Sequence, residues 1–332
     1  MSKHSMFQLQ VETAQGPFNR VERPIPTPAK GEVLVRIAAS GVNPLDAKIR
    51  AGAAAHARHP FPAVLGLDMA GEVVALGAGV SGFAVGDRVY GLTGGVGGIP
   101  GSLAQYAAVD ARLLARAPAS LSLREAAAMP LVVITAWEGL VDRARVSAGQ
   151  KVLVQGGAGG VGQVAIQLAR AFGAEAFATG RAGQAAFIEG LGATAIDFEK
   201  IPVEEMVARH TDSEGFDIVY NSIGGPALDD AFQAVRTYSG QVVSSLGWGS
   251  HSLAPLSFRG ASYSGVFTLL PLLSGKGREH HGQILAQAAR LVDAGLLKVH
   301  LDPRRFNLDQ AEEAHLLLTG GQAQGKLVVD IL

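Results

Sequence analysis

A glycine-rich stretch near the middle of the chain has the residue types and spacing of a dinucleotide-binding turn. Residues 157–162 carry the Gly-x-Gly-x-x-Gly pattern, after an apolar run at 151–154 that predicts a buried strand and before a stretch that predicts a helix. A turn without β-carbons lets the backbone approach a pyrophosphate, which the amides and dipole at the start of a helix attract. A glycine turn that serves only close packing of strand and helix is the alternative. The expected nucleotide contacts are Gly157, Ala158, Gly159, Gly160, Val161 and Gly162.

The end of the second expected strand predicts which nucleotide binds. A carboxylate at this place, about 20 residues beyond the glycines, would bind the ribose diol of NAD. The chain has Thr179-Gly180-Arg181 there and no acid. Arg181 can pair with a 2′-phosphate, a charge-assisted contact worth about 1.5–3 kcal/mol. We therefore expect NADPH rather than NADH, with Thr179 and Arg181 beside it; an exposed surface arginine is the alternative.

The composition favours an enzyme that acts on a small molecule. The chain has 332 residues, 48% of them hydrophobic, and a formal charge of −1 at pH 7, so it has no general attraction for nucleic acid or acidic membranes. It has no cysteine, which excludes disulfides, thiolate metal sites and a cysteine nucleophile. The sequence has neither a signal-peptide core nor an apolar run of ~20 residues. We expect a cytoplasmic protein that binds neither membranes nor nucleic acid.

The elements that must position the glycine turn form an α/β pattern. Short expected strands separated by glycine turns, at 31–38, 71–76 and 87–90, indicate a compact β-rich first domain. From Leu123 onward, strands alternate with helices, which predicts a doubly wound parallel sheet. Its expected strands are 151–154, 175–179, 194–197, 216–220, 241–244 and 262–266, and its expected helices are 182–191, 203–210, 227–237 and 282–294.

These patterns predict two domains and a dimer. Residues 1–120 and 298–332 should form the β-rich domain, because short strands return at the end of the chain, and residues 121–297 should form the nucleotide-binding domain. The expected last strand of the parallel sheet, 262–266, would be an unprotected edge in a single chain. We therefore expect a homodimer that covers this edge.

Several ordered motifs outside the glycine turn resemble the medium-chain dehydrogenase/reductase superfamily, and within it the zinc-free quinone oxidoreductases of the zeta-crystallin type. The resemblance covers nearly the whole chain. It implies a GroES-like catalytic domain, a Rossmann domain that binds NADPH, and a homodimer. The motifs are GVNPLD at 41–46, LGLDMAGEV at 65–73, VGDRVYG at 85–91, ITAW at 134–137 and NSIGG at 221–225.

The reaction that the resemblance implies is hydride delivery from a nicotinamide to a conjugated carbonyl, such as a quinone or another enone. The implied catalytic residues are Asn43, Asp46 and Lys48, the last at a position where many relatives carry tyrosine. Asn43 also has a structural interpretation, because Asn before Pro is a common turn starter. The further implied cofactor contacts are Thr135, Asn221, Ser222, Gly224, Ser245, Leu246, Phe267 and Lys326.

The chain departs from the zinc-containing members of this superfamily at their metal positions. Their catalytic zinc is held by Cys, His and Cys, where this chain has Asn43, Leu67-Asp68 and Leu131. A tetrahedral zinc site needs soft ligands and imidazole, which these residues do not provide. We expect hydride transfer without a metal.

Two other functions remain open at this level. An enoyl-thioester or 2-haloacrylate reductase would share hydride transfer to an activated double bond and would differ in the pocket. An NADPH-binding sensing or structural protein with little turnover is the alternative from another class. It remains open because Lys48 and Asn221 depart from the pattern of the relatives.

Overall fold

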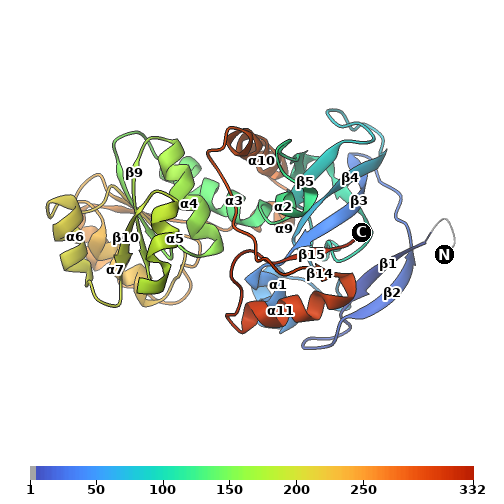
Figure 1. Cartoon of the computed structure of the whole chain (residues 1–332), viewed down its shortest axis with the longest axis horizontal. Helices are drawn as coiled ribbons and strands as arrows, with labels where there is room; N and C mark the ends of the chain where they lie inside the picture. Colours follow the sequence, from blue (N-terminus) through green and yellow to red (C-terminus); the bar gives the residue numbers. More distant parts are fainter. Residues whose placement is uncertain (1–4) are drawn as a thin grey trace. The chain divides into compact units, whose positions relative to one another are not determined.

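The computed structural model describes residues 5–332 and divides into two compact units. The first unit contains the residues up to Leu131 together with Leu269–Ala294 and Val299–Leu332, and the second contains Val132–Thr268 and Gly295–Lys298. The first is built on a largely antiparallel sheet and the second on a parallel sheet with helices (Figure 1). The expected α/β fold class is confirmed.

The sheet of the first unit has the strand order β14-β15-β3-β4-β5-β7, and β6 also pairs with β3. Strand β15 runs antiparallel to β3, with Val329 opposite Ser40, so the last strand of the chain belongs to this sheet. The hairpin of β1 (Ser5–Gln10) and β2 (Asn19–Pro24) pairs separately. The sheet strands are β3 (Glu32–Gly41), β4 (Asp68–Leu76), β5 (Arg88–Leu92), β6 (Tyr106–Asp110), β7 (Leu114–Arg116), β14 (Phe306–Asn307) and β15 (Val328–Asp330).

Helix α10 (Arg278–Asp293) packs in the first unit, whereas the sequence pattern placed these residues in the nucleotide-binding domain. Tyr90 of β5 donates a hydrogen bond to the backbone oxygen of Leu285 at 2.7 Å. A β-carbon on Gly282 would lie 2.6 Å from the backbone oxygen of Arg112, so the helix is seated closely against the turn before β7. This unit also contains α1 (Pro44–Arg50), α2 (Leu123–Ala127), α9 (Leu270–Ser274) and α11 (Ala311–Thr319).

The parallel sheet of the second unit has the order β10-β9-β8-β11-β12-β13. Val152, Leu153 and Val154 of β8 are fully buried; since successive side chains point to opposite faces, both faces of this strand are covered. The order reverses between β8 and β11, and ligands of such sheets bind outside the carboxyl ends of the strands at this switch point. The strands are β8 (Lys151–Gln155), β9 (Glu175–Gly180), β10 (Thr194–Asp197), β11 (Ile218–Asn221), β12 (Gln241–Ser244) and β13 (Ser262–Gly265).

Helix α4 (Gly160–Ala171) follows β8 directly and begins inside the glycine stretch. Aromatic side chains anchor the core between the sheet and its helices, with the rings of Phe177 and Phe216 5.3 Å apart beside Phe232. Every helix in the described part of the chain is too short or too polar to cross a bilayer. The other helical segments are α3 (Pro130–Trp137), which continues into a π-helical turn at Glu138–Arg143, α5 (Ala185–Gly190), α6 (Val203–Thr211), α7 (Pro226–Ala234) and α8 (Ala254–Arg259).

Candidate functional site

The glycine turn joins β8 to α4 in the second unit, and two of its glycines are required by packing. A β-carbon on Gly162 would lie 2.0 Å from the backbone oxygen of Gly156, and one on Gly157 would lie 2.6 Å from the β-carbon of Ala178. A β-carbon on Gly159 meets a milder contact, 3.2 Å from the same Gly156 oxygen. Packing therefore explains Gly157 and Gly162 better than it explains Gly159.

The start of α4 is suited to an anion. Gly159 is its N-cap residue, and no side chain among residues 5–332 caps it. The first amides of this helix therefore keep their donors for a ligand, and the dipole favours negative charge there. Thr179, at the end of β9, fixes the turn from the other side: its hydroxyl accepts the Gly156 amide at 3.1 Å and its backbone oxygen accepts the Gly157 amide at 2.9 Å. These residues fit the pyrophosphate of a dinucleotide.

Arg181 stands just beyond β9, as the sequence suggested, but it has an acidic partner. Its Nε lies 3.2 Å from Oε1 of Glu199, and the two side chains are 69% and 53% exposed. Glu199 follows β10, which pairs in parallel with β9. The end of β9 itself carries no acid, and the local sequence does not show that Glu199, from the end of the neighbouring strand, lies beside Arg181. An exposed ion pair of this kind is worth about 0–1 kcal/mol, so a stronger anion can replace Glu199.

Asn221 ends β11 and ties three strand ends together at the switch point. Its side-chain nitrogen donates to Gln155 at 2.7 Å, and its oxygen accepts from the Gly224 amide at 2.8 Å and from the Ser244 hydroxyl at 3.0 Å. Ser222 donates to the backbone oxygen of Gln155 at 2.8 Å. The described contacts of Asn221 are thus internal, and they hold in place the loop that sequence reasoning assigned to the ribose.

The remaining predicted contacts of the second unit lie after β12 and β13. Ser245 and Leu246 directly follow β12, and the Leu246 amide donates to the Ser244 hydroxyl at 3.1 Å. The Thr135 and Thr268 hydroxyls are 2.9 Å apart, which joins α3 to the segment after β13. The ring of Phe267 packs edge-on against Trp248, with centroids 6.2 Å apart.

The first unit contains a buried polar cluster made of Asn43, Asp46, Asp68 and Lys326, which we call the polar cluster. The side chain of Asn43 donates from Nδ2 to Oδ2 of Asp68 at 2.9 Å, and its Oδ1 accepts from the Lys326 ammonium. The ammonium also donates to the backbone oxygen of Val42 at 3.2 Å. Two predicted catalytic residues and a predicted cofactor residue therefore meet in one place.

Asp46 has a structural task at the start of α1. Its Oδ2 accepts the backbone amide of Asn43 at 2.9 Å, which is one half of a capping box, and its Oδ1 accepts the Gly66 amide at 3.1 Å. Burial raises the pKa of Asp46 to about 7, and the nearby negative charge of Asp68 also raises it. Lys48, the third predicted catalytic residue, is exposed on the same helix, and no described contact joins it to the polar cluster.

Asp68 is the member that sequence reasoning did not select. It begins β4, is fully buried, and its Oδ1 accepts the backbone amide of Leu131 at 2.9 Å. Burial raises its pKa to about 6, opposed by the charge of Lys326, and burial lowers the pKa of Lys326. The available signal was a lone carboxylate within the apolar run LGLDMA, because such a carboxylate needs a partner.

These donors do not fit zinc. Within residues 5–332, no group of three or more His, Cys, Asp or Glu side chains could hold a metal. Asn43 and Asp68 are bonded to each other, and an ammonium already occupies the amide oxygen of Asn43. An oxygen-only pair beside a fixed cation is a poor start for a tetrahedral site.

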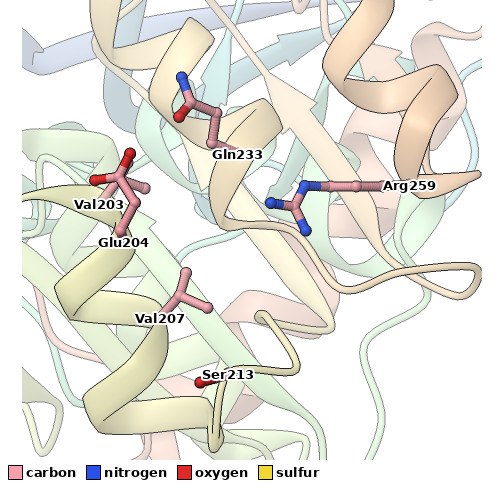
Figure 2. A pocket seen from close by; sticks show the side chains of 6 residues that line it. All are labelled: Val203, Glu204, Val207, Ser213, Gln233 and Arg259. Atoms are coloured by element: carbon pink, nitrogen blue, oxygen red, sulfur yellow. The ribbon is translucent and has the colours of Figure 1, made fainter.

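The second unit also has a recess on its helical surface that the predicted site residues do not line. Its volume is about 180 Å³, and Figure 2 shows the guanidinium of Arg259 pointing into it between α6 and Gln233 of α7. Glu204 and Ser213 are among the other residues that line it. We assign it no part in the chemistry.

Comparisons with known proteins agree with this geometry. Residues 29–119 match the family model described as alcohol dehydrogenase GroES-like domain, and residues 191–329 match the one described as zinc-binding dehydrogenase. The chain is 36% identical to the 2-methylene-furan-3-one reductase of Solanum lycopersicum over 318 residues, which cover 92% of this chain and 73% of that protein. It is 33% identical to the chloroplastic NADPH-dependent alkenal/one oxidoreductase of Arabidopsis thaliana, with the same shares covered.

The resemblance extends to solved structures. An alcohol dehydrogenase superfamily protein from Novosphingobium aromaticivorans is 54% identical, with a TM-score of 0.97 over 98% of this chain and 100% of that one. The likeness includes both the antiparallel sheet that carries the polar cluster and the parallel sheet that carries the glycine turn. The chain belongs to the medium-chain dehydrogenase/reductase superfamily of pyridine-nucleotide-dependent oxidoreductases.

Proposed function

We propose that this protein uses NADPH to reduce α,β-unsaturated carbonyl compounds, enones and quinones among them, by hydride transfer without a metal. The observation that carries the proposal is the uncapped start of α4 behind the glycine turn, with Arg181 at the end of the next strand. The names of two relatives, a furanone reductase and an NADPH-dependent alkenal/one oxidoreductase, support the same nucleotide and the same substrate class.

Each part of the second unit then has a task toward the nucleotide. The amides of Gly160 and Val161, in the first turn of α4, bind the pyrophosphate, and Arg181 leaves Glu199 to pair with the 2′-phosphate. The Asn221 loop holds the ribose side of the site through its internal bonds. When bound, the reduced nicotinamide supplies the hydride.

The polar cluster serves the substrate side in this proposal. Burial keeps water away from its charges, which strengthens every electrostatic interaction that it makes. Asn43 and Asp46 fix the turn into α1, and Lys326 supplies a positive charge. No step requires a metal, in keeping with donors that do not fit zinc.

The test is turnover of the purified protein with NADPH and, separately, NADH. The panel should contain a cyclic enone, an alkenal, a quinone and an enoyl thioester, each with and without a chelator. We expect NADPH to be consumed with the enones and quinones, and the rate to be unaffected by the chelator. Preference for the thioester would support an enoyl-thioester reductase instead. Tight NADPH binding without consumption would support the low-turnover alternative, and loss of activity on chelation would contradict the metal-free reaction.

A further inference from the structure

Hydrogen bonds fix both the backbone and the side-chain ammonium of Lys326. The backbone on both sides is paired: its amide donates to the His300 oxygen at 2.8 Å, and its oxygen accepts the Asp302 amide at 3.0 Å. Its ammonium donates to the backbone oxygen of Val42 and to Oδ1 of Asn43. A lysine side chain normally loses much rotamer freedom when it is fixed, so this placement requires compensating contacts.

The contacts around Lys326 leave one of its donors for a ligand. An ammonium has three N–H groups, and within residues 5–332 two of them have acceptors. Asn43 and Asp68 have no exposed surface and Asp46 has 1%, whereas Lys326 keeps 6%. Lys326 is therefore the least buried residue of the polar cluster, and its ammonium has one donor without an acceptor in the described part of the chain.

The charges of the polar cluster require a cation. A buried carboxylate is stable in its ionised form only beside a positive charge or several donors. Asp68 has Asn43 and the Leu131 amide as donors, and Asp46 has two backbone amides. Lys326 is the cation whose charge acts on both carboxylates.

We propose that the Lys326 ammonium, held by Asn43 and the Val42 carbonyl and balanced by Asp68, stabilises the negative charge that develops on the substrate's carbonyl oxygen. This inference rests on the proposed function. The β-carbon receives a hydride from the reduced nicotinamide, which is oxidised. The electron pair of the carbon–carbon double bond shifts so that negative charge forms on the carbonyl oxygen, and a proton from water adds at the α-carbon. The ammonium donates a hydrogen bond to that oxygen and keeps its own proton.

Lys326→Met tests the charge, with Lys276→Met as a matched control at an exposed lysine of the same unit. Removing one preorganised donor from a developing oxyanion lowers kcat on the order of 100-fold. We expect that loss in Lys326→Met, with the dissociation constant for NADPH, measured by its fluorescence, within about twofold of wild type. Lys276→Met should match wild type in both. In Lys326→Ala, added ethylammonium should restore part of kcat, because it returns a cation to the emptied space.

A second readout does not depend on turnover. Without the ammonium, the Asp46 and Asp68 carboxyls bind their protons more tightly in the folded state, while the unfolded chain releases them. The melting temperature of Lys326→Met should therefore fall further below that of wild type as the pH rises from 6 to 8. If Lys326→Met does not fold, Lys326→Arg replaces it: kcat should fall because the fork geometry differs, while the pH dependence of unfolding stays like that of wild type.

The outcomes separate this inference from the proposed function. A wild-type protein that reduces none of the panel contradicts the proposed function itself. An active wild type with an equally active Lys326→Met variant contradicts only the role of Lys326. The role of Lys326 is also contradicted if the melting temperatures of wild type and Lys326→Met depend on pH in the same way, because Lys326 would then carry no charge in the folded protein.

Discussion

Arg181 and Glu199 form an exposed pair that bears directly on the choice of nucleotide. The carboxylate competes with a 2′-phosphate for the same guanidinium, and it could also accept a hydrogen bond from the free ribose hydroxyl of NADH. The phosphate carries more charge and more acceptor oxygens, so NADPH should win this competition. Glu199 then reduces the preference for NADPH over NADH that Arg181 creates.

Arg181→Gln should therefore lower the ratio of NADPH to NADH affinity by about 10- to 100-fold, the equivalent of a charge-assisted contact of about 1.5–3 kcal/mol. Glu199→Gln should raise NADPH affinity by no more than about fivefold, because an exposed pair is worth less than about 1 kcal/mol. Fluorescence titration with both nucleotides measures these ratios. Arg209→Gln, in another exposed ion pair of the same unit, is the control. An unchanged ratio in Arg181→Gln would disprove the assignment.

At the scale of single residues, the sequence predicts which residues belong to the site but not which of them contact each other. Asn43 and Lys326 were both candidates, yet they are 283 residues apart, and nothing in the local pattern shows that they touch. The local pattern does not show the partners of Asp68 for the same reason, since Asn43 is 25 residues away from it and Leu131 is 63 residues away. Buried polar contacts across such distances depend on the assembled sheet.

At the scale of the elements, substitutions in the glycine turn before α4 can distinguish a glycine that is needed for packing from one that is needed for nucleotide binding. Gly162→Ala should destabilise the fold by about 1–3 kcal/mol or more, because its β-carbon would overlap the backbone at Gly156. Gly159→Ala has a backbone conformation open to any residue and a milder contact, so it should fold. Its methyl group would stand where the pyrophosphate approaches, and NADPH affinity should fall about tenfold or more.

The control for this pair is Gly190→Ala on α5, where a β-carbon would meet no described atom within 4 Å apart from its chain neighbours and the backbone of its own helix. It should bind NADPH like wild type and be slightly more stable, because alanine favours a helix more than glycine does. Melting temperature and NADPH titration separate the variants. Should Gly159→Ala bind NADPH as tightly as Gly190→Ala, the turn would serve packing alone.

The elements that the sequence predicted well are those with a strong local pattern. The strands of the parallel sheet lie close to their expected positions because each is a short apolar run after a turn. Helix α8 (Ala254–Arg259) was not expected, since its six residues contain one buried apolar side chain, Leu256. Helix α10 was expected as a helix, but its place in the first unit depends on Tyr90, 195 residues from its acceptor Leu285.

At the scale of the whole molecule, the edge strand β13 points to a second copy of the chain. The strand ends the sheet order, and its residues are mostly exposed. Tyr263 is 37% exposed, and Phe258 of the preceding helix is 87% exposed. An uncovered edge with apolar side chains is a site of strand pairing, and two copies related by a twofold axis would continue the sheet through it.

The direction of the amides on β13 gives this prediction a sharp test. The amide of Ser262 donates to the oxygen of Gly240, just before β12, and the amide of Val266 donates to Ser244 of β12, so by alternation the amide of Gly265 points to the open edge. Gly265→Pro removes that donor and leaves the bonds to β12 in place, which edge strands tolerate. Sedimentation should show twice the mass of one chain for the wild type and the mass of one chain for this variant. Ala195→Pro, at the opposite edge on β10, should remain dimeric, because that edge is not the one that pairs. A wild type that sediments as a single chain, or a dimer that survives Gly265→Pro and dissociates with Ala195→Pro, would show that β13 is not the interface.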